Sequence, residues 1–515
     1  MPANTIDITA AVEAEKDVRT AAVRVAFEEL LSWTIAGANS PTLHRFEKGA
    51  TARLAAVGLA LLELWLVVVL PNQVPAQRRY GRGWYGYLGL TREVVRSRLG
   101  EVWAPRPTWR LVGGSGPLLM SDHDRRLGLA AGRMSLNVHL LVARVIALLP
   151  FDTALEVLRS LGGYVPSKRS ALGIADQLGP QASAFLDEMP VPEDDGEILV
   201  IQVDGKGAPM MRPEEHRLRC RPHQKRPRGL SKRAFRRWRR HNRHRVRRKA
   251  GDKSKNAKMA TVGVIYTLRR LEDGTLEGPI HKRVIGTFAP PLKLFQRLHR
   301  EAVRRGYGTK ETIFLADGAN HLWRLKDAFF PQATGCLDWF HLSEYLWTAG
   351  GTVHAAGSDA LAAWVRERQG ELRLGKVDDV IAAMDTLNTR IARTGPGTKG
   401  RRERLAKARQ YLDKRRHIVP YDKLLAKDLD IATGMIEGAV RHAIGVRLDG
   451  PGCRWSLERA EHVLALRCVV INGHWDDFTT RVITTHERLT PWVVPRITPA
   501  HPMSPHAAKS RKKAA

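Results

Sequence analysis

The chain has 515 residues, of which 43% are hydrophobic and 26% charged; this length allows two to four domains, and the composition excludes collagen-like repetition and wholesale disorder. Lysine and arginine (84) outnumber aspartate and glutamate (52), and the net charge of +32 favours a polyanionic partner, nucleic acid ahead of a membrane surface. Four cysteines without a C-x-x-C pair exclude a secreted disulfide framework, and the N-terminus lacks the pattern of a signal peptide, so we expect a cytoplasmic protein.

Residues 1 to about 110 are predicted to form a mostly helical N-terminal region. Residues 54 to 70 (LAAVGLALLELWLVVVL) are apolar except for Glu63, and they fall just short of the roughly 20 residues that cross a bilayer. Because Glu63 would be costly in lipid, we interpret this stretch as a buried helix, ended by Pro71, rather than as a membrane span. Glycine and proline between residues 105 and 117 predict a linker and a domain boundary.

Residues 111 to 190 are predicted to hold a helix-turn-helix that binds DNA. Helical patterns cover residues 136 to 149, 151 to 161 and 168 to 178, and Ser167 is the expected N-cap of the last helix. Lys168 and Arg169 lie in its first turn, where the helix dipole disfavours cations, which favours contact with a phosphate or a base edge. An ordinary helical hairpin with solvated ends explains the same pattern equally well.

From residue 191 to about 480 the pattern changes to short apolar runs between helices, which predicts an α/β catalytic domain. Its first three strands are ILVIQVDGKG, ATVGVIYTL from Ala260 and RVIGTF from Arg283; a helix over 291 to 305 and the strands ending in LADGA and GCLDW follow. Residues 350 to 430 are predicted to be a helical insertion, and helices are expected over 435 to 448 and 457 to 471. The tail, 481 to 515, is expected to be largely disordered.

A basic arm, residues 213 to 258, lies between the first two predicted strands. Its segment from 216 to 258 has 20 lysines and arginines and a single acid, Asp252. We predict that it binds DNA, because so dense a charge opposes compaction without a polyanion. The contacts are expected from arginines that surround two aromatic residues, Phe235 and Trp238, namely Arg236, Arg237, Arg239 and Arg240. Cys220, His223, His241 and His244 have spacings that a zinc site allows, but phosphate contacts are the better interpretation among so many arginines.

Three acids stand where a polar site is expected in an α/β sheet. Asp204 closes the first strand, Asp317 closes the fourth, and Glu437 lies in a helix after the insertion. Three converging carboxylates suit Mg²⁺ or Mn²⁺, which prefer hard oxygen ligands, and two such ions activate water and stabilise the leaving oxygen of a phosphodiester. Taken singly, each aspartate is also an ordinary Asp-Gly turn residue, and Glu437 also suits a surface pair with Arg441.

The strings VDGKG, LADGANHLW, LDWFHLSEYLW and TGMIEGAVRHAIGVRLDGPGCRWSLERAEHVLALR resemble bacterial insertion-sequence transposases of the DDE superfamily, close to the Kra-type group and related to Mutator-like elements. The resemblance covers about residues 195 to 475. It implies an RNase H-like fold, with a mixed five-stranded sheet, flanking helices and a helical insertion ahead of the last acid. It also implies that Asp204, Asp317 and Glu437 form the metal-binding triad and that Asp338 and His341 form a (C/D)-x-x-H motif.

Several residues around these motifs keep two interpretations. Asp338 competes with Asp317 as the second metal ligand, and we favour Asp317 because it directly ends a strand. His341 is expected to position a phosphate or orient an acid, although a partly buried structural histidine is equally compatible. Lys206, in VDGKG, and Arg454 are expected to contact DNA. Trp455 either stacks on an extruded base or anchors the next helix.

The expected function is therefore that of a transposase, in which the protein cleaves DNA at the inverted repeats of its element and joins the freed end to target DNA. Metal-dependent in-line phosphoryl transfer is the expected chemistry. Cutting two ends together implies at least a dimer on DNA, with no role for a membrane, in the cytoplasm at the nucleoid. The alternatives are an RNase H-like structure-specific nuclease and a non-catalytic nucleic-acid-binding protein.

Overall fold

The computed structural model describes residues 5–36, 42–81, 83–114, 119–120, 127, 129–130, 133–212, 229–241, 257–488 and 501–502. The chain is mixed α/β and divides into two compact units. Unit 1 comprises residues 1–174 and 476–515, and unit 2 comprises residues 175–475. The expected boundary near residue 110 coincides with neither division.

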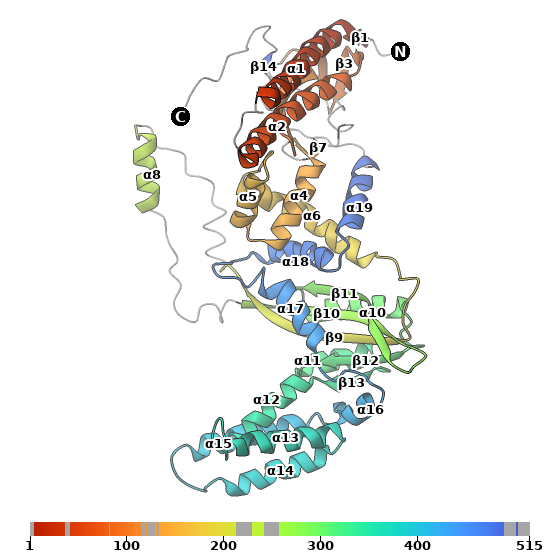
Figure 1. Ribbon diagram of the computed structural model, residues 1–515, viewed down its shortest axis with the longest axis vertical. Coiled ribbons are helices and arrows are strands. Elements are labelled where there is room, and N and C mark those ends of the chain that lie inside the picture. Colours follow the sequence, from red (N-terminus) through yellow and green to blue (C-terminus); the bar gives the residue numbers. More distant parts are fainter. Residues whose placement is uncertain are drawn as a thin grey trace. The chain divides into compact units, whose positions relative to one another are not determined.

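Unit 1 begins with two long helices that pack along each other, α1 (Thr9–Ala36) and α2 (Leu43–Val68) (Figure 1). The rings of Trp33 and Phe46 stack between them at 5.3 Å. A two-stranded ladder joins β1 (Thr5–Asp7) to β2 (Gln73–Pro75). The strands of a larger sheet are β3 (Gln77–Tyr80), β4 (Gly83–Ser97), β5 (Gly100–Leu111), β6 (Leu119–Met120), β7 (Leu129–Ala130), β8 (Met134–Ser135) and β14 (His501–Pro502).

The N-terminal region is therefore less helical than the sequence predicts, and the expected linker is wrong. Residues 83 to 111 form a long antiparallel hairpin, in which Thr91 pairs with Arg106 and Val95 with Val102. Aromatic and β-branched residues favour these strands, and pairing with a distant partner overrides the local glycines and prolines. Proline lacks a backbone N–H and is therefore tolerated where one edge of a strand is open. Among the described residues, the second edge of β5 is paired only at Thr108 and Trp109, which leaves that edge open at Pro105 and Pro107.

The expectation that residues 54 to 70 form a buried helix is also wrong. They belong to α2, which is long and apolar enough to cross a membrane by length and composition, yet only 11% of its most apolar window is buried. Leu66 and Val67 are buried, whereas Leu54 and Leu61 are exposed. Such a helix is weak evidence for a membrane span, and it is the one helix of this kind among the described residues.

The three helices of the expected helix-turn-helix are present. They are α4 (Leu136–Leu148), α5 (Phe151–Ser160) and α6 (Lys168–Asp187), and α6 extends nine residues further than the sequence predicts. Ser167 is the N-cap of α6, because its hydroxyl oxygen accepts a hydrogen bond from the Ser170 N–H at 3.1 Å. The helices hence confirm the local pattern and leave DNA binding as a prediction.

Unit 2 is built on a mixed sheet of five strands, as the sequence predicts. The strands are β9 (Ile198–Pro209), β10 (Ala257–Arg270), β11 (Leu276–Thr287), β12 (Glu311–Ala316) and β13 (Thr334–Leu337), in the spatial order β11-β10-β9-β12-β13. Strand β10 is antiparallel to both of its neighbours, whereas β12 is parallel to β9 and to β13. The carboxyl ends of β9, β12 and β13 therefore point the same way.

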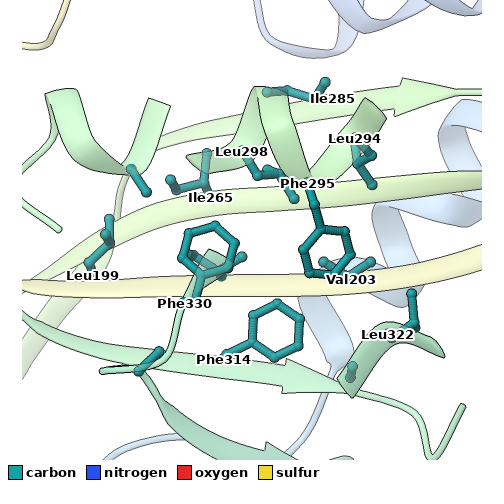
Figure 2. Packing of buried hydrophobic residues seen from close by; sticks show 14 residues of the cluster. Leu199, Val203, Ile265, Ile285, Leu294, Phe295, Leu298, Phe314, Leu322 and Phe330 are labelled. Carbon is teal, nitrogen blue, oxygen red and sulfur yellow. The ribbon is translucent and has the colours of Figure 1, made fainter. Parts of the chain in front are cut away.

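One face of this sheet carries the hydrophobic core of unit 2. Alternate residues of β9, among them Leu199 and Val203, pack with Phe295 and Leu298 of α10 (Pro291–Arg304) and with Phe314 of β12 (Figure 2). Helix α11 (Asn320–Phe329) completes the layer. Because side chains alternate along a strand, the residues between these, including Gln202 and Asp204, lie on the opposite face.

The rest of unit 2 is helical. After β13 come α12 (Trp339–Gly350), α13 (Asp359–Arg373), α14 (Val377–Arg390), α15 (Thr398–Asp413) and α16 (Tyr421–Leu425), which confirm the helical insertion. Then come α17 (Gly434–Val440), a π-helical turn (Arg441–Gly445) and α18 (Leu457–Ile471). The helix that follows, α19 (Trp475–Arg488), belongs to unit 1 from residue 476 on. Residues 481–488 thus belong to a helix, which corrects the expected start of a disordered tail.

The basic arm is described only in part. Its central segment forms α8 (Lys232–His241), on which the rings of Phe235 and Trp238 stack at 5.9 Å. Residues 213–228 and 242–256 lie outside the described residues.

Candidate active site at the carboxyl edge of the sheet

Three acids follow three aligned positions of neighbouring strands. Val203 of β9 pairs with Ala316 of β12, which pairs with Leu337 of β13. Asp204, Asp317 and Asp338 are the next residues, so they stand level at this edge of the sheet. Neighbouring strands are about 4.8 Å apart, which places each acid one strand spacing from the next.

Glu437 is carried by a helix that packs on the same sheet. Helix α17, which carries it, packs against β9 and β10. The buried amide of Gln202 fixes the start of this helix, because its Oε1 accepts the Ile436 N–H at 3.0 Å while its Nε2 donates to the Tyr266 hydroxyl at 3.1 Å. Gln202 shares its face of β9 with Asp204, so this contact sets Glu437 on the side of the sheet where Asp204 lies.

The carboxylates interact electrostatically. Burial raises the pKa of Asp204 above its ordinary value, and the negative charges of Asp317 and Glu437 raise it further. The Gly205 N–H, which donates to Asp204 Oδ1 at 2.6 Å, and the positive charge of His341 act in the opposite direction. Asp204, Asp317, Glu437 and His341 are therefore close enough to influence one another's ionisation.

Asp338 is buried at the edge of this site, and both of its carboxylate oxygens are hydrogen-bonded within the protein. Its side chain is fully buried, and Oδ1 accepts hydrogen bonds from the Thr433 N–H at 2.9 Å and the Thr433 hydroxyl at 2.7 Å. Its Oδ2 accepts the His341 N–H at 2.9 Å as the N-cap of α12, and it bonds His341 Nδ1 at 2.6 Å. Both carboxylate oxygens of Asp338 are thus occupied by hydrogen bonds within the protein.

Asp338 couples His341 to the helix of the third acid. The backbone oxygen of Thr433 accepts the Glu437 N–H at 3.0 Å, so Asp338 ties the start of α12 to the first turn of α17. The hydrogen bond from His341 to Asp338 raises the pKa of His341 to about 9, and the charges of Asp317 and Asp204 add to this effect. His341 is consequently a cation at neutral pH, beside two of the acids.

The donor set suits a divalent cation of the magnesium type. Asp204, Asp317 and Glu437 present only carboxylate oxygens, and the pKa of Asp204 is raised by burial and, to a smaller extent, by the charges of Asp317 and Glu437, which a bound cation would offset. As the side chains lie, no three His, Cys, Asp or Glu residues within the described ranges are near enough to hold a metal ion together. The Glu437 side chain is exposed, whereas the level positions of Asp204 and Asp317 follow from the pairing of β9 with β12.

The helical insertion supplies contacts that the sequence did not indicate. Arg415, just after α15, donates to the Gly318 carbonyl oxygen through Nε at 3.0 Å and through a second nitrogen, which also donates to Asn320 Oδ1 at 2.8 Å. Its guanidinium lies 4.2 Å above the ring of Tyr411. A Cβ at Gly318 would lie 2.2 Å from the Tyr411 hydroxyl oxygen. The insertion thereby holds the loop that follows Asp317.

Neither Arg415 nor Gln202 has a sequence signal strong enough to select it. Arg415 is one of many arginines in a charged segment, and Gln202 is one polar residue within an apolar strand. A polar residue in the middle of a buried strand is the signal that would have singled out Gln202, because a buried amide requires partners.

The predicted DNA contacts are distributed unevenly. Lys206 lies on the face of Asp204, two residues further along β9, and a Cβ added at Gly445 of the π-helical turn would lie 3.6 Å from its Cε. Arg454 is half-buried, and Trp455 is 5% exposed, with its ring N–H donating to the Leu448 oxygen at 2.8 Å. Trp455 therefore anchors the chain, in agreement with the second of its two interpretations.

The remaining predicted contacts lie elsewhere. In unit 1, Lys168 and Arg169 are exposed at the start of α6, and Lys168 forms an ion pair with Asp152 at 2.5 Å. In unit 2, Arg236 and Arg237 are exposed on α8. The side chains of Arg239, Arg240 and His241 lie outside the described residues, as do Cys220, His223 and His244, the residues of the zinc alternative. Cys336, Cys453 and Cys468 are free thiols.

No protein-family model and no curated protein matches this chain.

Proposed function

We propose that this protein is a metal-dependent phosphoryl-transfer enzyme acting on DNA, namely a transposase of an insertion sequence with an RNase H-like catalytic domain. The observation that carries the proposal is the register of β9 and β12, which sets Asp204 and Asp317 side by side under the helix of Glu437. The mixed five-stranded sheet and the helical insertion ahead of Glu437 support the fold assignment.

The residues have distinct roles in this proposal. Mg²⁺ or Mn²⁺ bound by Asp204, Asp317 and Glu437 would supply charge neutralisation and an activated oxygen nucleophile at a phosphodiester. The His341 cation draws the phosphate toward the two aspartates and holds its proton at Nδ1 against Asp338. Asp338 is a positioning residue, and Lys206 extends the positive charge along β9, where a DNA strand would leave the site.

The charge of +32 supports DNA as the partner, with the inverted repeats bound by the helices of unit 1 and nonspecific contacts made by α8. Joining two ends requires two active sites, so we propose at least a dimer on DNA. A cytoplasmic location at the nucleoid follows from the substrate. The structure-specific nuclease and the non-catalytic DNA-binding protein remain the competing functions.

The test uses purified full-length protein, magnesium and DNA that carries the element's ends. We expect nicks at the ends and joined products, and Asp204→Asn, Asp317→Asn and Glu437→Gln should each lower cleavage on the order of 1,000-fold or more while DNA binding persists. An exposed acid away from the site, Glu272→Gln, is the matched control and should keep full activity. Cleavage without joining favours the nuclease, and binding without cleavage favours the non-catalytic protein.

A further inference from the structure

Among the described residues, helix α2 presents an exposed apolar stripe that is continuous from Leu54 to Val68 and is separated from the exposed Leu43 by the exposed Glu47. We call Leu43, Leu54, Leu61, Trp65 and Val68 the outer stripe; each of these side chains is 49 to 71% exposed. At 100° per residue they fall within an arc of about 60° on the helix. Leu54, Leu61 and Val68 repeat every seven residues, the spacing by which one helix packs along another.

The inner side of α2 is already occupied. Leu59, Leu62 and Leu66 pack on the cluster formed by the β4–β5 hairpin. Glu63 forms an ion pair with Arg19 of α1 at 2.5 Å, and Arg53 lies 4.2 Å above the Trp33 ring. A bilayer span would strip these contacts and place Glu63 in lipid, which is costly. A partner of α2 can therefore contact only its outer side, and its own apolar surface must be as narrow as the outer stripe.

The charge around the stripe excludes the partner that suits the rest of the chain. Helices α1 and α2 together contain seven acidic and six basic residues, so they are almost neutral in a protein whose net charge is +32. A polyanion has no attraction to this surface. A helix with little net charge and a matching apolar stripe suits this surface. Two copies of this basic chain can approach each other here without the charge repulsion between their other surfaces.

We propose that the outer stripe of α2 is the contact between two copies of this protein, paired helix against helix about a two-fold axis. A self-complementary patch on one neutral helix is the kind of surface that two-fold dimers use. The 26 residues of α2 give a seam about 39 Å long, at 1.5 Å per residue. This inference does not rest on the proposed function, because it concerns the protein without DNA.

The test measures the mass of nucleic-acid-free full-length protein by sedimentation equilibrium in 0.5 M salt. The wild-type protein is expected to be a dimer of 57.6 kDa chains. The double variant Leu54→Glu/Leu61→Glu is expected to be monomeric, and Leu54→Ala/Leu61→Ala, which keeps the helix neutral, should weaken the dimer about 100-fold because four leucine side chains leave the contact. Val25→Glu, an equally exposed site on α1, is the matched control and should remain dimeric.

Circular dichroism verifies that each variant is folded. A monomeric wild-type protein at 50 μM would overturn the proposal, as would dimers that persist in both stripe variants or dissociate in Val25→Glu. Wild-type protein that floats with phosphatidylcholine vesicles, when the stripe variants do not, would show that lipid covers the stripe and would also overturn it.

Discussion

The ion pair between Asp338 and His341 predicts how far the pKa of His341 changes in the variant Asp338→Asn. Asparagine keeps an oxygen for the Thr433 hydrogen bonds but loses the charge that holds the proton on His341. The pKa of His341 should fall from about 9 toward its ordinary value of 6.5. At pH 8 the protonated fraction would then drop from about 90% to about 3%. Because the His341 side chain is 39% exposed, solvent screens its attraction to Asp338. We therefore expect the pKa of His341 to fall by about one unit or more in Asp338→Asn.

The assay is an NMR titration of protein labelled at histidine Cε1. A His341→Gln variant assigns the signal among the 19 histidines, and the other signals serve as internal controls. The sign of the linked stability follows from the raised pKa: the pair stabilises the fold fully below pH 6.5, and this contribution disappears as the pH rises through about 9. A His341 signal that titrates near 6.5 in the wild-type protein, or near 9 in Asp338→Asn, would refute the reasoning.

Three further expectations concern neighbouring parts of unit 2. Gln202→Leu leaves an N–H of α17 and a tyrosine hydroxyl unpaired, so the free energy of unfolding in urea should fall by about 1–3 kcal/mol; an unchanged midpoint would contradict this. Arg415→Ala frees the loop at Gly318 and should lower cleavage about tenfold at unchanged DNA affinity, with partial recovery in Arg415→Lys; equal activity of the alanine variant would remove the loop contact from the mechanism. Replacing Arg236 and Arg237 by alanine should reduce the salt slope of DNA binding by about 2, whereas their replacement by lysine should preserve it.

The sequence alone located much of the site, because local features report strand ends and helix starts. Short apolar runs followed by Asp-Gly predicted that Asp204 closes the first strand and that Asp317 closes the fourth. Asp317 directly follows β12, whereas β9 continues past Asp204 to Pro209, so the prediction for Asp204 is wrong. The predicted N-cap Ser167 and the predicted helix over 457 to 471 are confirmed. The rank of Asp317 over Asp338 also came from the strand pattern. In the structure the two carboxylate oxygens of Asp338 accept hydrogen bonds from Thr433 and His341, and the choice of metal ligand stays a prediction.

Other features depended on which distant segments meet, and no local pattern contains that information. The hairpin of residues 83 to 111 is stable only because its two halves pair, so its prolines and glycines were misread as a linker. Trp455 is buried because the chain returns to the end of β9, where its N–H donates to the Pro209 oxygen. The outer face of α2 is exposed because the opposite face packs against α1 and β5. Hydrophobic periodicity predicts which residues can be buried, and tertiary packing decides which of them are.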